Sequence, residues 1–161
     1  MPNQQQIDLL KQGVEAWNKW RQEHESTETD LNEADLSNIN LRGANLSRVN
    51  LSGTDLSSAD LGKTDLSWSS LVGANLSSAN LVEAKLSGTD LSGADCHESD
   101  LSAADFSGAT LLDTNLIGAN LSNANFHDAD LKGAFLRGAN LTGAIISSEQ
   151  LNQARSPDDL P

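Results

Sequence analysis

Cysteine, proline and aromatic residues are all scarce in this sequence of 161 residues, and each scarcity narrows the possible folds. Aromatic side chains make up 4% and Tyr is absent, so the core must rely on the many Leu and Ala residues. The single cysteine, Cys96, excludes an internal disulfide, and the first thirty residues lack the pattern of a signal peptide. No apolar run approaches the roughly 20 residues of a membrane span. We therefore expect one cytoplasmic domain that does not enter a membrane.

Basic residues are also few, because ten Lys and Arg side chains stand against 23 Asp and Glu side chains. The resulting formal charge of −13 opposes direct binding to nucleic acid or to anionic lipid. We expect instead a protein partner with a basic surface.

The sequence is rich in one feature, an apolar residue at every fifth position from Leu31 through Ile146 without any insertion. Of these 24 centre positions, 20 are Leu, and the others are Cys96, Phe106, Phe126 and Ile146. A small residue, most often Ala, lies two positions before each centre, and Asp or Asn usually lies one position before it. Because repeats with a fixed period indicate a solenoid, this pattern determines the predicted fold.

A five-residue period fits neither an α-helix nor a straight β-strand, because both would scatter the Leu side chains over different faces. The chain must therefore bend once in every repeat. A short extended segment can direct the small residue and the Leu inward, while Ser, Gly, Asp and Asn form the corner. Successive coils can then stack about 4.8 Å apart with strand-like hydrogen bonds.

The pattern A-(D/N)-L-x-x, as in residues 44–48 and 129–133, resembles the pentapeptide-repeat family, and residues 10–21 resemble the N-terminal leaders of its cyanobacterial members. The resemblance implies an all-β solenoid, a right-handed four-sided β-helix with four pentads in each coil and about six coils. We divide the chain into an N-terminal capping helix and linker (1–28), the β-helix (29–148) and a C-terminal cap (149–161).

Both ends of such a rod would expose apolar side chains and strand edges, so caps are expected. Residues 4 to about 24 fit one helix that begins with Asn3 and Gln6 as a capping pair. At the other end, Ser148 can cap a short helix, and Leu160 can close the last coil. The apolar arc of the N-terminal helix would consist of Ile7, Leu10, Val14 and Trp17, widened by Leu9 and Trp20.

No combination of residues indicates catalysis, so we predict no catalytic, cofactor-binding or metal-binding residues and no cofactor. Of the three histidines, His24 lies near the end of the N-terminal helix, and His97 and His127 directly follow centre positions, so they should lie far apart and point outward. Cys96 occupies a centre position, which favours a small buried side chain over a nucleophile.

The surface acids are the main indication of function. We favour a non-catalytic scaffold that presents flat acidic faces to a protein. The alternative is a regulator of DNA gyrase that mimics DNA, because the family resemblance includes such inhibitors. Residues twenty apart should stack in columns along the rod, and in these columns most acids have neutral or basic neighbours above and below. This pattern disfavours mimicry of DNA. A third possibility, binding to an ordered lattice such as ice through the serine column 47, 67, 87 and 107, is remote because Ser lacks a methyl group.

A modest apolar patch is also expected on the outside of the rod, where it could support a partner or a weak homodimer. Ile117 and Phe135 should lie in neighbouring coils, with Leu112 on the adjoining face. Trp68, Val72 and Val82 should also point outward.

Overall fold

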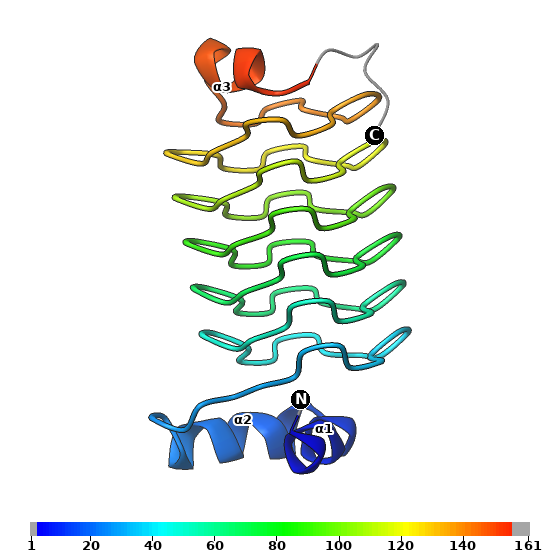
Figure 1. The fold of residues 1–161 in the computed structure, drawn as a ribbon, viewed down its shortest axis with the longest axis vertical. Helices are drawn as coiled ribbons and strands as arrows, with labels where there is room; N and C mark the ends of the chain where they lie inside the picture. Colours follow the sequence, from blue (N-terminus) through cyan, green and yellow to red (C-terminus); the bar gives the residue numbers. More distant parts are fainter. Residues whose placement is uncertain (1–2, 156–161) are drawn as a thin grey trace.

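The chain forms a right-handed four-sided rod in which each coil rests on the coil before it (Figure 1). The structure is a computed structural model that describes residues 3–155. Parallel bridges join residues twenty apart, from Asp30 with Asn50 through Asn125 with Ile145, without a change of register. Twenty residues therefore make one coil, and the predicted four pentads per coil and six coils are confirmed. Each pairing is a single-residue bridge, because the chain bends before a longer strand can form.

The centre residues form a continuous apolar stack along the axis. The Leu residues at centre positions from Leu31 to Leu131 are at most 2% exposed. The rings of Phe106 and Phe126, in successive coils, stack with their centroids 4.8 Å apart. Small residues lie beside the stack, and where one is Thr its hydroxyl donates to a backbone carbonyl, as Thr54 does to Leu31 at 3.0 Å. The interior is thus apolar, and its buried hydroxyls are hydrogen-bonded.

The corners have the same backbone geometry in every repeat. In nearly every repeat, the amide three residues after the centre donates to the carbonyl of the centre residue and closes a turn, as when Ala34 N donates to Leu31 O at 3.2 Å. The third residue of the turn has a positive φ in all 23 pentads from Glu33 to Gly143. Gly occupies ten of these positions and other residues occupy 13. The stacking of coils therefore compensates the small cost of the left-handed backbone at the 13 non-glycine positions.

Two helices lie across the N-terminal end, in place of the single helix that we predicted over residues 4–24 (Figure 1). Helix α1 spans Gln4–Lys11 and α2 spans Val14–Glu23. Gly13 lies between them with a φ of 121°, a conformation that no helix contains. The break allows both helices to place apolar side chains on the first coil. Ile7, Leu10 and Trp17 are buried, as the apolar arc predicted, and Leu9, Val14 and Trp20 are partly buried.

Polar side chains of the same two helices bind the free backbone edge of the first coil. Asn3 caps α1 by accepting from Gln6 N, but the Gln6 side chain does not complete the pair. It bonds instead to the backbone of Glu28 and Asp30. Trp17 donates its indole N–H to Asn45 O at 2.8 Å. The N-terminal cap thus covers the apolar stack and also satisfies the strand edge.

At the C-terminal end, the described residues form one short helix, α3, Ser148–Gln153. Its N-cap is Ser147, one residue earlier than we predicted, because Ser147 and Gln150 form a reciprocal capping box. No residue of α3 is buried, and Leu151 is 42% exposed. The prediction that Leu160 closes the last coil concerns a residue outside the described range.

Candidate interaction surface

The outward-facing charges are unequally divided among the four sides of the rod. Side 1 carries the pentads centred on Leu31 and every twentieth residue after it, and sides 2, 3 and 4 likewise start from Leu36, Leu41 and Leu46. Over residues 29–148, side 1 has five acids and one base, and side 2 has four acids and one base. Sides 3 and 4 each have three acids and two bases. Sides 1 and 2 share an edge, so most of the negative charge faces one half of the rod's circumference.

Hydrogen bonds hold the carboxylates that precede the centre residues in fixed positions. The Oδ1 atom of each such Asp accepts from the amide two residues later, as Asp95 does from His97 N at 3.1 Å. In six places it also accepts from the side-chain amide of an Asn in the next coil, as Asp95 does from Asn115 at 3.0 Å. The alternation of Asp and Asn that we ascribed to charge repulsion therefore also provides a bond between coils. The other pairs are Asn50–Asp30, Asn75–Asp55, Asn80–Asp60, Asn120–Asp100 and Asn125–Asp105.

Asp35 shows the electrostatic effect of this arrangement most clearly. The hydroxyl of Ser37 donates to its carboxylate at 2.7 Å and the Ser37 amide donates at 3.1 Å. These bonds, the hydroxyl first, lower the pKa of Asp35. The group therefore keeps its charge under mildly acidic conditions.

The histidines and the cysteine lie where the repeat predicted, and the structure does not bring them together. His97 bonds to Asp95 at 2.9 Å, His127 is exposed, and His24 stacks on Trp20. Burial, with a smaller effect from the charge of Asp95, raises the pKa of the Cys96 thiol to about 12. Cys96 is thus a protonated core residue at neutral pH. Within residues 3–155, no group of three or more His, Cys, Asp or Glu side chains could hold a metal ion.

The prediction that Phe135 belongs to an exposed apolar patch on the outside of the rod is wrong. Phe135 is only 8% exposed, because the chain after α3 folds back and places the guanidinium of Arg155 4.7 Å from its ring centroid. Ile117 is half-buried. Among the described residues of the coils, the exposed large apolar side chains are Trp68 at 66%, Ile145 at 62% and Val72 at 40%. Trp68 and Val72 lie four residues apart, on the adjoining sides 4 and 1. The Trp68 indole lies flat over Gly88 of the next coil, where a Cβ atom would come within 2.5 Å of the ring.

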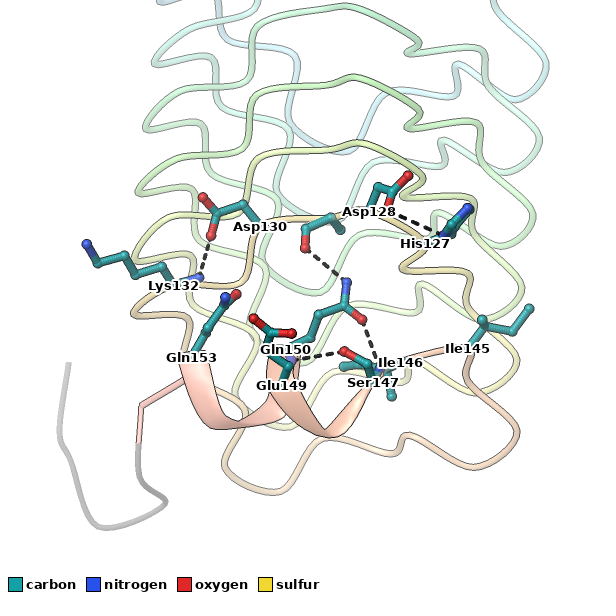
Figure 2. Close-up of a pocket in the computed structure, with 11 residues that line it drawn as sticks. His127, Asp128, Asp130, Lys132, Ile145, Ile146, Ser147, Glu149, Gln150 and Gln153 are labelled. Carbon is teal, nitrogen blue, oxygen red and sulfur yellow. Dashed lines mark hydrogen bonds and ion pairs between the residues drawn. The ribbon is translucent and has the colours of Figure 1, made fainter.

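An open groove of about 900 Å³ lies between α3 and the last two coils (Figure 2). Apolar Ile145 and Ile146 line one part, and most of the other lining residues are polar. The Gln150 side chain crosses it to reach the carbonyls of Phe126 and Ala129. His127 and Asp128 are 3.7 Å apart and largely in solvent, which does not constitute a catalytic pair. The remaining lining residues are Ala129, Asp130, Lys132, Ser147, Glu149 and Gln153.

Comparison with known proteins agrees with this architecture. The family model for pentapeptide repeats matches in eight copies, in overlapping segments that extend from residue 27 to residue 155. The chain belongs to the pentapeptide repeat family. Members of this family are generally structural modules without catalytic activity. Among curated proteins, no match is found.

Several solved pentapeptide repeat structures are similar to this one. A protein from Nostoc PCC 7120 is 32% identical, with a TM-score of 0.56, over 63% of this chain and 83% of the other. A protein of the Arabidopsis thaliana thylakoid lumen is 30% identical, with a TM-score of 0.43, over 68% and 70%. HetL of Nostoc sp. strain PCC 7120, involved in heterocyst differentiation regulation, is 34% identical, with a TM-score of 0.37, over 82% and 74%.

Within residues 3–155, no helix is long and apolar enough to cross a membrane.

Proposed function

We propose that this pentapeptide repeat protein is a non-catalytic scaffold that binds a protein partner through sides 1 and 2. The observation that carries the proposal is the concentration of acids on these two adjoining sides, nine acids against two bases over residues 29–148. Such a surface favours a partner with a basic face, because complementary charge speeds association and selects the partner. A cytoplasmic location is part of the proposal, supported by the buried, unpaired thiol of Cys96.

The rigidity of the acidic sides supports recognition by shape as well as by charge. Asp55, Asp90 and Asp95 each accept a backbone amide in their own corner, at 2.9, 2.9 and 3.1 Å. Carboxylates that are already fixed lose little side-chain entropy on binding, so less of the interaction energy is lost to ordering. A partner would therefore meet charges at intervals set by the coil spacing.

The proposal can be tested with two triple variants that remove equal charge from different sides. The first, Asp55→Asn, Asp90→Asn and Asp95→Asn, removes three negative charges from sides 1 and 2. The second, Asp65→Asn, Asp100→Asn and Asp105→Asn, removes three from sides 3 and 4. Asn fills the same corner position in many native pentads, so both variants should fold. In each set, two of the three carboxylates also accept an Asn amide from the next coil.

The measurement is affinity capture from a cell extract by wild-type protein and by both variants at physiological salt. We expect proteins retained by the wild type to be lost from the first variant and kept by the second. Equal retention by all three proteins would contradict the assignment of sides 1 and 2.

The same variants test the alternative of a DNA mimic that acts on gyrase. A mimic should inhibit DNA supercoiling by purified gyrase and should lose potency in both variants, because a duplex presents charge all around its axis. The Asn residues between successive acids do not favour this function. Inhibition by the wild type that both variants weaken equally would replace the scaffold proposal.

A further inference from the structure

Trp68 differs from the other corner residues of the rod in its size and in its exposure. It ends side 4 at the corner where side 1 begins, and it is the only aromatic residue among the 13 described non-glycine residues with a positive φ. Its side chain is 66% exposed, the highest value among the large apolar residues of the described chain. Burial in the rod therefore does not explain a Trp at this corner, where ten other pentads have Gly.

The indole ring of Trp68 has one covered face and one open face. A Cβ atom at Gly88, in the next coil, would lie 2.5 Å from Cε3 and 2.7 Å from both Cδ2 and Cζ3 of the ring. Because three neighbouring ring atoms are almost equally distant, Gly88 lies beneath the ring face and not at the ring edge. Within the described residues, the one cation over an aromatic ring is Arg155 at Phe135. The outer face of the Trp68 indole can therefore receive a group from another molecule.

Two carboxylates that can accept further hydrogen bonds flank this corner. Asp65 precedes Trp68 on side 4, and Asp90 lies on side 1, two residues after the glycine that supports the ring. The Oδ1 atom of each accepts from the backbone amide two residues later, at 3.0 and 2.9 Å. Six other Asp residues also receive an Asn amide from the next coil, but here the next coil has Lys85 and Thr110. Within the described chain, no group donates to the Oδ2 atom of either carboxylate.

The bases near the corner leave side 1 as the direction from which a cation can approach the indole. Arg48 lies at the same corner one coil earlier, and Lys85 lies on side 4. The one base of side 1, Lys132, lies two coils beyond the coil of Asp90. Val72, which is 40% exposed, adds apolar surface on the same side. A cationic side chain that reaches the ring from side 1 therefore meets an acid and apolar surface before it meets a base.

We propose that Trp68 is the anchor of the binding surface on side 1 and that it binds an arginine side chain of the protein partner. The guanidinium stacks on the open face of the indole and donates to the Oδ2 atom of Asp90. Arg fits better than Lys, because a planar guanidinium can stack on a ring while the N–H groups at its edge bond to a carboxylate. An exposed Trp among weaker polar contacts is also a common centre of a binding hot spot. This inference rests on the proposed function, since the arginine belongs to the basic face that sides 1 and 2 would bind.

The test uses blocked hexa-arginine and hexa-lysine peptides as probes, titrated into the isotope-labelled full-length protein at physiological salt. NMR follows the indole N–H signals of the three Trp residues, and the signal missing from the Trp68→Gly spectrum is that of Trp68. Trp68→Gly should fold, because it introduces the residue that ten other corners already have. Arg48→Gly is the matched control, since it shortens a large side chain at the same corner one coil earlier.

We expect hexa-arginine to shift the Trp68 indole signal and to bind the wild type roughly five- to thirtyfold more tightly than Trp68→Gly. Hexa-lysine has the same charge but cannot stack in the same way. The preference of the wild type for hexa-arginine over hexa-lysine should therefore be lost in Trp68→Gly and kept in Arg48→Gly. Asp90→Asn should weaken the binding of hexa-arginine roughly two- to fivefold.

Equal binding of hexa-arginine by the wild type and by Trp68→Gly would overturn the inference. If the triple variant of sides 1 and 2 then binds hexa-arginine more weakly, the acidic sides act without Trp68 and the proposed function stands. If that variant also binds equally, or if neither peptide binds the wild type, the proposed function fails as well. A Trp68 signal that shifts with the neutral sugar cellohexaose and not with hexa-arginine would overturn the inference in favour of a carbohydrate ligand.

Discussion

The two ends of the rod face the same physical problem and treat it differently. At the N-terminal end, α1 and α2 bury the apolar stack under Ile7, Leu10 and Trp17 and bond the strand edge through side chains such as Gln6. At the C-terminal end, α3 bonds part of the edge through Gln150 and buries none of its own residues. A solenoid cap therefore has two separable tasks, apolar cover and edge pairing, and α3 performs mainly the second.

The N-terminal cap also buries the charged side chain of Arg21, which hydrogen-bonds to the backbone edge of the first coil. Arg21 is 6% exposed and donates to the hydroxyl of Thr29 and to the carbonyl of Ser47, both at 2.7 Å. Burial lowers the pKa of its guanidinium. Because burying a guanidinium is costly, a carbonyl edge left without partners must be more costly at this end. No similar buried charge occurs among the described residues of α3.

The largest effect should come from the stack that joins the two ends. Leu81 is fully buried in the middle of the rod, and Leu81→Asp would place a carboxylate among Leu side chains. We expect the free energy of unfolding to fall by more than about 4 kcal/mol, with loss of the cooperative transition. Urea denaturation followed by circular dichroism measures this. The control is Val82→Asp, one residue later and half-buried on the outside, which should change stability by less than about 1 kcal/mol. Similar losses in both variants would contradict an inward-facing stack.

At the N-terminal end, Trp17→Ala should remove both functions of the cap at once. Trp17 is fully buried and its indole donates to Asn45 O at 2.8 Å. We expect a loss of about 3–5 kcal/mol in the free energy of unfolding. The partly buried Trp20 offers a control, for which Trp20→Ala should cost roughly 1 kcal/mol in the same urea titration. A small effect at Trp17 would mean that the first coil does not need its lid.

The fold could be predicted from the sequence because a single repeat determines it. Each pentad has the same two inward-facing positions and the same corner positions. An exceptional residue in one pentad therefore does not obscure the pattern that the other 23 repeat. The apolar arc of the N-terminal cap was predictable for the same reason, since Ile7, Leu10 and Trp17 follow a helical period.

The details at the ends and on the surface could not be predicted, because each depends on a partner distant in the sequence. A single glycine is tolerated in helices, so Gly13 alone did not indicate the break. The burial of Phe135 depends on Arg155, which returns to it only after α3. The Asn–Asp bonds form where the Asn lies in the coil after the Asp, as Asn115 does relative to Asp95. The alternation of Asp and Asn along the sequence does not by itself predict this direction.

Gln150→Ala separates edge pairing from apolar cover at the C-terminal end. The Gln150 side chain accepts from Ser147 N and donates to Phe126 O and Ala129 O, yet it covers no part of the stack. We expect a loss of about 1–2 kcal/mol. Gln153→Ala is the control, because Gln153 contributes its backbone carbonyl to Gly133 and should cost less than about 0.5 kcal/mol. Thermal and urea unfolding of the wild type and both variants would show whether the two losses differ as expected.

The smallest effect should come from Leu151→Ala, the substitution that compares apolar cover at the two ends directly. Leu151 is 42% exposed, whereas Leu10 in α1 is 1% exposed. In dilute protein, Leu151→Ala should lower the free energy of unfolding by about 0.5 kcal/mol or less, and Leu10→Ala should lower it by roughly 2–5 kcal/mol. Comparable losses would show that α3 covers the stack as α1 does. A near-zero loss at Leu151 beside a large loss at Leu10 would mean that the last coil relies on something other than α3 for its apolar cover.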